Sequence, residues 1–199
     1  MKYSLIIPIY NEARIINELI NQLNTLHKTI EIILIDDGSS DASYSILKEH
    51  KKNFVLLKNE KNYGKGFCIN KALDFATNEN IILMDGDLEI EIDNIHKLLK
   101  KYSETKTIVI GTRWNEKKHH SINYYGNIII NKIFNIIYGT SFCDILCCLK
   151  IINKGTLKSL DLKSMRFGIE TEIMAKLAMK ESQITQISVS YSPRTRKEG

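Results

Sequence analysis

The chain has 199 residues, of which 43% are hydrophobic and 26% charged, with only 2 prolines and 10 glycines. This ordinary globular composition argues against disorder or long linkers and suits a single domain over residues 1–199. The net charge of +5 is mild and dispersed, so we expect no nucleic-acid partner. The most apolar stretch, 128–149, is interrupted by polar and charged residues, so it does not predict a transmembrane helix.

The four cysteines have no spacing that suits zinc, and two of them are adjacent, which is a poor disulfide framework. They are Cys68, Cys143, Cys147 and Cys148. The N-terminus also runs directly into an apolar segment without a signal peptide. We therefore expect buried thiols and a cytoplasmic location.

Apolar, β-branched runs alternate with amphipathic stretches along the first half of the chain. The runs predict strands at 3–9, 31–35, 54–57, 80–84 and 107–110. Apolar residues at helical spacing predict helices between them, and the second half adds expected helices at 123–138 and 169–179, with strands inside 144–152 and at 183–189. Nearly all-apolar strands alternating with helices predict an α/β fold, with a mostly parallel sheet and helices on both faces.

Polar motifs follow three of these predicted strands. They are Tyr10-Asn11-Glu12, Asp36-Asp37-Gly38 and Asp85-Gly86-Asp87. Because ligands bind beyond the carboxyl ends of parallel strands, we expect the three motifs to meet at one edge of the sheet and form a site.

The Asp85-Gly86-Asp87 motif places two carboxylates one residue apart. Like charges this close raise each other's pKa unless a cation lies between them. Oxygen ligands of this kind suit Mg²⁺ or Mn²⁺, which commonly bridge to phosphates. The motif predicts a metal–diphosphate site with Asp85 and Asp87 as ligands and Glu89 completing the set, although such pairs also occur in solvated loops.

The ordered motif series resembles the inverting family 2 glycosyltransferases of the GT-A fold. The resemblance rests on 6–12, 35–41, Asn62-Tyr63-Gly64-Lys65-Gly66, 85–87 and Gly111-Thr112-Arg113. The second half resembles the polyprenyl-phosphate (dolichol-phosphate) mannosyl- or glucosyltransferase branch through 144–150, 167–172 and 194–199. The resemblance implies a nucleotide-sugar-binding half at 1–115 and an acceptor-side half at 116–199.

The resemblance also implies roles for single residues in the donor half. The residues expected to bind the nucleotide sugar are Pro8, Tyr10, Glu12, Ile35, Asp37, Lys65, Asp85, Gly86, Asp87 and Arg113. Alternatives stay open: Glu12 could only complement a helix dipole, Asp37 could be a turn residue, and Lys65 could stand in an ordinary loop.

In the acceptor half, Lys150, Arg194 and Arg196 are expected to bind the acceptor phosphate or the nucleoside diphosphate. Asp144 and Glu172 join Asp87 and Arg113 as catalytic candidates, since either could orient cations or act as a base. The alternatives are a basic tail for the arginines and an exposed helix face for Glu172.

The implied activity is metal-dependent transfer of a sugar from a GDP-mannose or UDP-glucose type donor to a polyprenyl phosphate. A phosphate acceptor is already ionised, so it needs no strong base. Transfer to a saccharide hydroxyl in cell-surface glycan synthesis, a nucleotidyltransferase and a non-catalytic nucleotide-sugar-binding module are the alternatives. A lipid acceptor would require contact with the cytoplasmic face of a membrane, through the helix 123–138 or a membrane partner; this helix could instead belong to the core.

Overall fold

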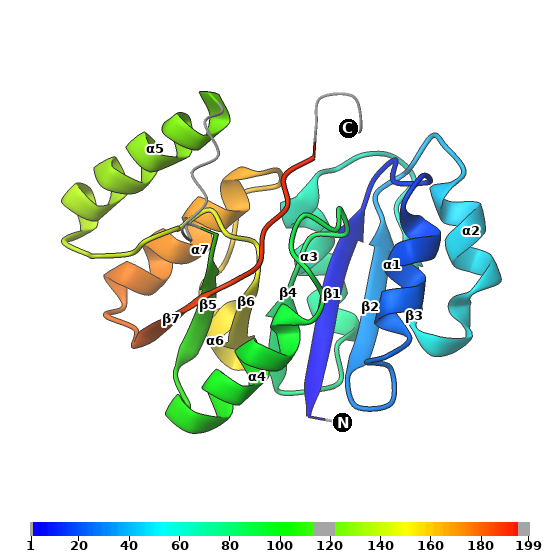
Figure 1. The fold of residues 1–199 in the computed structure, drawn as a ribbon, viewed down its shortest axis with the longest axis horizontal. Coiled ribbons are helices and arrows are strands. Elements are labelled where there is room, and N and C mark those ends of the chain that lie inside the picture. The colour runs from blue at the N-terminus through cyan, green and yellow to red at the C-terminus, as the bar shows by residue number, and fades with distance from the viewer. Residues whose placement is uncertain (1, 114–121, 195–199) are drawn as a thin grey trace.

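The computed structural model describes residues 2–113 and 122–194, and within these ranges one seven-stranded sheet forms the centre of the molecule (Figure 1). Its strand order is β3-β2-β1-β4-β6-β5-β7. The strands are β1 (Tyr3–Ile9), β2 (Glu31–Asp36), β3 (Val55–Lys58), β4 (Asn80–Leu83), β5 (Ile108–Thr112), β6 (Lys150–Asn153) and β7 (Ile184–Ser188).

The sheet is mostly parallel, as the sequence predicts. β1 pairs in parallel with β2 and β4, β2 with β3, and β5 with β7, whereas β6 runs antiparallel to both β4 and β5. Ile9 lies opposite Asp36 in the β1–β2 register, so β1 and β2 end side by side. This register brings the motifs that follow these two strands to the same edge of the sheet.

Helices cover both faces of the sheet because successive strand side chains point to opposite sides. In β1, Leu5, Ile7 and Ile9 pack toward α1 (Ile16–Leu23), α2 (Ser43–Glu49) and α4 (Asn94–Thr105). Ile6 packs toward the opposite layer, which consists of α3 (Lys65–Phe75), α6 (Lys154–Ser159) and α7 (Gly168–Met179). Buried side chains on both faces form the core, and a short 3₁₀ turn (Lys51–Asn53) follows α2.

The helix α5 (Ile122–Tyr138) lies outside these two layers, beyond β5 and beside α7 (Figure 1). Phe134 packs with Ile110 and Met174 in a small separate cluster. Many isoleucines on the rest of the helix are exposed. Among the described residues, no helix is both long and apolar enough to cross a membrane.

The second half departs from expectation in two places. Only Lys150–Asn153 of the predicted strand region 144–152 forms a strand, and the preceding residues are irregular. The helix α6 was not predicted; the Asn153 side chain caps it by accepting hydrogen bonds from the backbone N–H groups of Gly155 and Thr156.

Candidate active site

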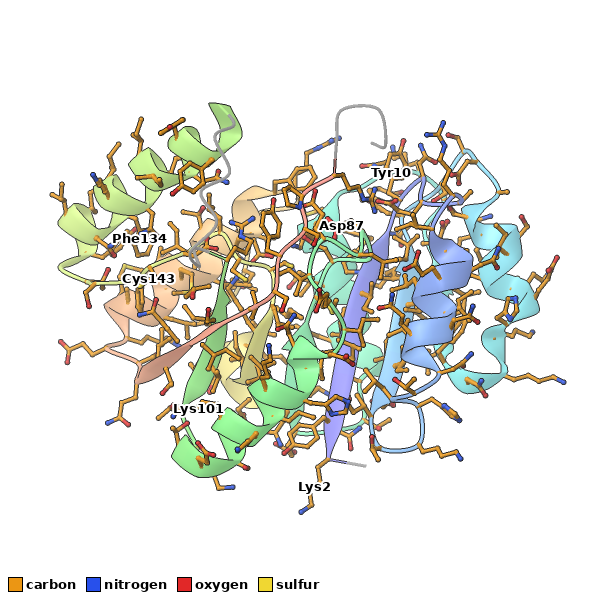
Figure 2. All side chains as sticks on the ribbon, viewed as in Figure 1. Lys2, Tyr10, Asp87, Lys101, Phe134 and Cys143 are labelled. Carbon is orange, nitrogen blue, oxygen red and sulfur yellow. The ribbon has the colours of Figure 1, made fainter. Side chains whose placement is uncertain are left out.

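A cleft of about 400 Å³ opens at the edge of the sheet where β1, β2 and β4 end. Figure 2 places Tyr10 and Asp87 together at this edge, opposite Lys2. The predicted residues that line the cleft are Pro8, Tyr10, Glu12, Asp37, Lys65, Asp85, Gly86 and Asp87. The three strand-end motifs therefore form one site.

Ile35 is the exception among the predicted β1–β2 residues. It is fully buried and belongs to the core cluster beneath α3. The expectation that its side chain contacts the nucleotide sugar is wrong, because Ile35 lies within β2 and packs into the core, whereas Asp37 lies just beyond the end of β2 at the rim of the cleft.

Asp37 holds the loop that precedes α3. Its Oδ1 accepts hydrogen bonds from Asn59 Nδ2 at 2.8 Å and from the backbone N–H of Tyr63 at 3.0 Å, and its Oδ2 accepts from the N–H of Gly64 at 2.7 Å. Asp37 thus lines the cleft and also fixes one wall of it.

The glycines around Lys65 permit close packing of protein against protein. Gly64 has a φ of +100°, and a Cβ at this position would lie 2.5 Å from the carbonyl oxygen of Met165. A Cβ on Gly66 would meet the Ser164 carbonyl even more closely. Gly64 and Gly66 therefore let the start of α3 pack tightly against the segment 164–166.

The Asp85-Gly86-Asp87 loop lies at the floor of the cleft. Burial and the neighbouring charge of Asp85 raise the pKa of Asp87 to about 6. Gly86 packs closely on β1, since a Cβ there would lie 2.3 Å from Ile9 Cδ1 and would displace the end of that side chain. The loop holds a carboxylate whose ionised form is costly without a nearby cation.

Glu89 does not join this pair as a third ligand. Its Oε1 accepts a hydrogen bond from the backbone N–H of Arg194 at 3.0 Å. Within the described ranges, no three His, Cys, Asp or Glu side chains lie close enough together to hold a metal ion. Two carboxylates still fit Mg²⁺ or Mn²⁺ if the diphosphate and water supply the other oxygens, which is how Mg²⁺ commonly binds.

A chain of alternating charges runs from the cleft into the core. Lys65 Nζ lies 2.5 Å from Asp85 Oδ1 and 2.5 Å from Glu170 Oε1. Glu170 also pairs with Lys150, whose ammonium group contacts the Cys147 carbonyl as well. Burial tends to lower the pKa of Lys65, but the two carboxylates outweigh it and hold that pKa well above the ordinary value.

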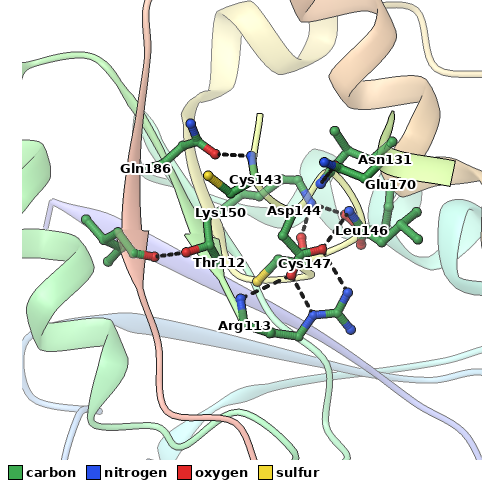
Figure 3. Close-up of polar contacts among 12 residues, drawn as sticks. Thr112, Arg113, Asn131, Cys143, Asp144, Leu146, Cys147, Lys150, Glu170 and Gln186 are labelled. Carbon is green, nitrogen blue, oxygen red and sulfur yellow. Dashed lines mark hydrogen bonds and ion pairs between the residues drawn. The ribbon is translucent and has the colours of Figure 1, made fainter. Parts of the chain in front are cut away.

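Lys150 is therefore placed differently from expectation. Its side chain is 0% exposed and ends inside the protein at Glu170 (Figure 3). It cannot contact an acceptor phosphate from this position. Glu170 binds both lysines, and its place in the 167–172 motif is the only sign of this role in the sequence.

Glu172 also departs from its predicted role. Its carboxylate accepts hydrogen bonds from the backbone N–H groups of Lys163 and Ser164 and pairs with Lys176. Burial alone would raise the pKa of Glu172, but these partners lower it to about 2. Glu172 anchors the 163–164 loop and is a poor candidate for a base.

Arg113 and Asp144 form a bidentate pair (Figure 3). Arg113 Nε donates to Asp144 Oδ2 at 2.8 Å and Nη2 donates to Oδ1 at 2.9 Å. Asp144 is buried, and the backbone N–H of Arg113 donates to it too. Of the two predicted roles for Asp144, this geometry matches the orienting one.

Arg194 lies across the cleft floor. Its Nε donates to the carbonyl oxygen of Asp87 at 2.8 Å, and its Nη1 donates to Glu12 Oε2 at 2.8 Å. Burial raises the pKa of Glu12, and the Arg194 guanidinium opposes that shift. Arg194 is thus part of the site, whereas Arg196 lies outside the described residues.

Two residues from the loop before α7 line the cleft without having been predicted. They are Arg166 and Phe167. Phe167 belongs to a quoted motif, but its position at the cleft depends on how 164–166 packs against Gly64 and Gly66. That contact is a tertiary feature with no local sequence signal.

The fold and the strand-end site define the class: a nucleotide-diphospho-sugar transferase fold of the GT-A type. The chain belongs to glycosyl transferase family 2, whose family model matches residues 4–160.

Relatives and solved structures agree with this family. The chain is 34% identical to the uncharacterized protein MJ0544 of Methanocaldococcus jannaschii, over 94% of this chain and 87% of that protein. It is 29% identical to glycosyltransferase AglJ of Haloferax volcanii, over 94% of this chain but 62% of that protein's length.

The crystal structure of Mycobacterium tuberculosis glucosyl-3-phosphoglycerate synthase with Mn²⁺, UDP and product superposes with a TM-score of 0.77 at 15% identity, over 99% and 74% of the two chains. The mannosyltransferase PcManGT of Pyrobaculum calidifontis, solved with GDP-Man and Mn²⁺, gives 0.71 at 17%, over 98% and 58%. At these low sequence identities, the structural similarity shows a shared fold.

Proposed function

We propose that this glycosyltransferase moves a sugar from a nucleotide sugar to a polyprenyl phosphate, with inversion at the anomeric carbon and with a divalent metal. The observation that carries the proposal is that the carboxylates lining the cleft are largely occupied by partners within the protein. In the described part of the cleft, every lining carboxylate except Asp87, the proposed metal ligand, is bound to protein groups: Glu12 pairs with Arg194, Asp85 pairs with Lys65, and Asp37 binds loop amides. An acceptor that brings its own ionised oxygen suits such a site, because it needs no base.

Asp87 and Asp85 are the residues that would hold Mg²⁺ or Mn²⁺ together with the donor diphosphate. When bound, the metal supplies charge neutralisation for the departing diphosphate. The raised pKa of Asp87, about 6, supports this role, since a cation would relieve the cost of its buried charge. The Mn²⁺ present with UDP in the mycobacterial enzyme and with GDP-Man in PcManGT supports it further.

The base and ribose of the donor would occupy the part of the cleft formed by Pro8, Tyr10 and Asp37. Tyr10 is exposed and can stack on a base. The UDP and GDP-Man in the superposed structures support a donor of either nucleotide type.

Helix α5 is the surface proposed to meet the lipid, at the cytoplasmic face of a membrane. Ile136 is 82% exposed and Ile137 is 68% exposed, although Phe134 on the same helix is buried. A helix with one buried and one exposed apolar face fits an interfacial position. Replacing Ile136 and Ile137 by Asn should reduce flotation with anionic vesicles, and unchanged flotation would leave membrane contact to another surface or to a membrane partner.

The direct experiment pairs GDP-mannose, UDP-glucose and related donors with a short-chain polyprenyl phosphate, with Mn²⁺ or with EDTA. We expect a lipid-linked sugar from at least one donor in Mn²⁺ and none in EDTA. Absence of such a product with every donor would refute the acceptor, while product that persists in EDTA would refute the metal.

Transfer to a saccharide hydroxyl is the second candidate, and one observation favours it. Asp87 has a pKa of about 6, within the range useful for a general base near neutral pH. The same donor panel with oligosaccharide acceptors separates the two functions, since only the second candidate predicts a saccharide product.

A further inference from the structure

Four of the cations that the sequence predicted for phosphate binding lie in the described residues, and all four are bound to carboxylates within the protein. Lys65 pairs with Asp85 and Glu170. The other pairs are Lys150 with Glu170, Arg113 with Asp144 and Arg194 with Glu12. A cation that is already compensated in this way attracts an added anion less than an uncompensated one does.

Arg166 differs from these paired cations. It lines the cleft and its side chain is exposed. In the described ranges 2–113 and 122–194, no carboxylate lies within ion-pairing distance of its guanidinium. Its charge is therefore available to a ligand in the cleft.

The segment that carries Arg166 is held firmly in place. The backbone N–H of Phe67 donates to the Met165 carbonyl at 3.1 Å, and the Arg166 carbonyl accepts from the N–H of Ile169 at 3.2 Å. The Arg166 side chain begins directly over Gly64, where a Cβ would lie 2.7 Å from Arg166 Cγ. The backbone of Arg166 is thus fixed beside Gly64 and Lys65 at the cleft wall.

Phe167 adds an aromatic ring to the same wall. Its side chain is 83% exposed although it lines the cleft. An aromatic residue left this open at a ligand cleft can pack against an apolar or planar group.

We propose that Arg166 binds a phosphate group of a ligand in this cleft and that Phe167 packs against the organic part of the same ligand. The guanidinium supplies charge-assisted, two-pronged hydrogen bonds that match phosphate oxygens. The ligand class is a phosphate ester, and it has two sources that rest on the proposed function: the nucleoside diphosphate of the donor and the polyprenyl phosphate acceptor.

The test measures binding of two probes, GDP or UDP with Mn²⁺ and farnesyl phosphate, by calorimetry. The variants are Arg166→Gln and Phe167→Ala. Lys163→Gln is the matched control, because it removes one positive charge from the same loop. The ammonium group of Lys163 pairs with exposed Asp161 outside the cleft. We expect Arg166→Gln to weaken one probe roughly tenfold to hundredfold, Phe167→Ala to weaken the same probe, and the control to match wild type.

The affected probe identifies the source of the phosphate. The proposal is overturned if Arg166→Gln binds each probe with the same affinity as wild type. It is also overturned if wild type binds neither probe. Unchanged affinity in Phe167→Ala overturns the role of the ring. If Arg166 governs nucleotide binding but no lipid-linked sugar forms, this inference stands and the proposed acceptor fails.

Discussion

The first and the second half of the chain use their polar and charged residues in different ways. At the ends of β1, β2 and β4, residues such as Tyr10 and Asp87 line the cleft directly. In the second half, Lys150, Asp144 and Glu172 are bound to protein groups. The difference indicates that strand ends present side chains to the ligand, while these three charged residues of the second half hold other parts of the protein in position; Arg166 and Phe167 are second-half residues that line the cleft.

Glu170 gives the largest expected effect on stability. Glu170→Gln would leave the buried ammonium groups of Lys65 and Lys150 without their shared carboxylate. Breaking a buried ion pair on one side costs about 3–5 kcal/mol, which urea denaturation would measure. Glu104→Gln, at an exposed pair with Lys101, should cost at most about 1 kcal/mol. Equal losses of unfolding free energy in Glu170→Gln and Glu104→Gln would contradict a stabilising role for the buried charges of the second half.

Asp87 gives the largest expected effect on activity. Asp87→Asn should lower transfer more than about 100-fold and weaken Mn²⁺ binding, because it removes a proposed metal ligand. The variant should remain folded, with the far-UV circular dichroism spectrum of wild type. Exposed Asp93→Asn is the control and should remain active. Full activity in Asp87→Asn would exclude the metal role.

The Asp144–Arg113 pair tests the positioning role of the second half. Asp144→Asn removes the charge from a buried bidentate pair, so we expect a loss of about 1.5–3 kcal/mol in the free energy of unfolding. Asp161→Asn, at an exposed pair with Lys163, should leave the free energy of unfolding near that of wild type. A stable Asp144→Asn protein that loses only transfer would instead make Asp144 a direct participant.

The last prediction is a pH dependence of stability. The pKa of Asp87 rises from 3.8 to about 6 on folding. The folded state then binds the extra proton between these values, so the contribution of Asp87 to stability falls as pH rises through this window. Without divalent metal, the stability of wild type relative to Asp87→Asn should be higher at pH 4 than at pH 7. A difference that does not change with pH would contradict the shifted pKa.

The sequence predicted the sheet class and the strand-end site because both follow from local patterns. Buried strands read as apolar runs, and Asp37 and Asp87 stand in the polar motifs that follow such runs. Ile35 shows the limit of a motif, since it lies within the buried strand β2 and packs into the core, while Asp37, just beyond the strand end, lines the cleft. Predicting a whole motif as ligand-binding ignores where the buried strand ends.

The second half could not be predicted to the same depth because its residues act through distant partners. Glu170 meets Lys65 across 105 residues of sequence, and no local pattern distinguishes it from Glu172 two positions later. Arg166 reaches the cleft only because Gly64 and Gly66 admit its backbone so closely. Ion pairs between residues far apart in the sequence decide which charged side chains remain available to a ligand.

The most direct test of the central claim is the anomeric configuration of the product made from an α-linked nucleotide sugar, polyprenyl phosphate and Mn²⁺. Nuclear magnetic resonance of the purified lipid product would measure it. Inverting transfer at this site predicts a β-linked sugar on the polyprenyl phosphate. An α-linked lipid product, or sugar found only on a saccharide hydroxyl, would contradict the account.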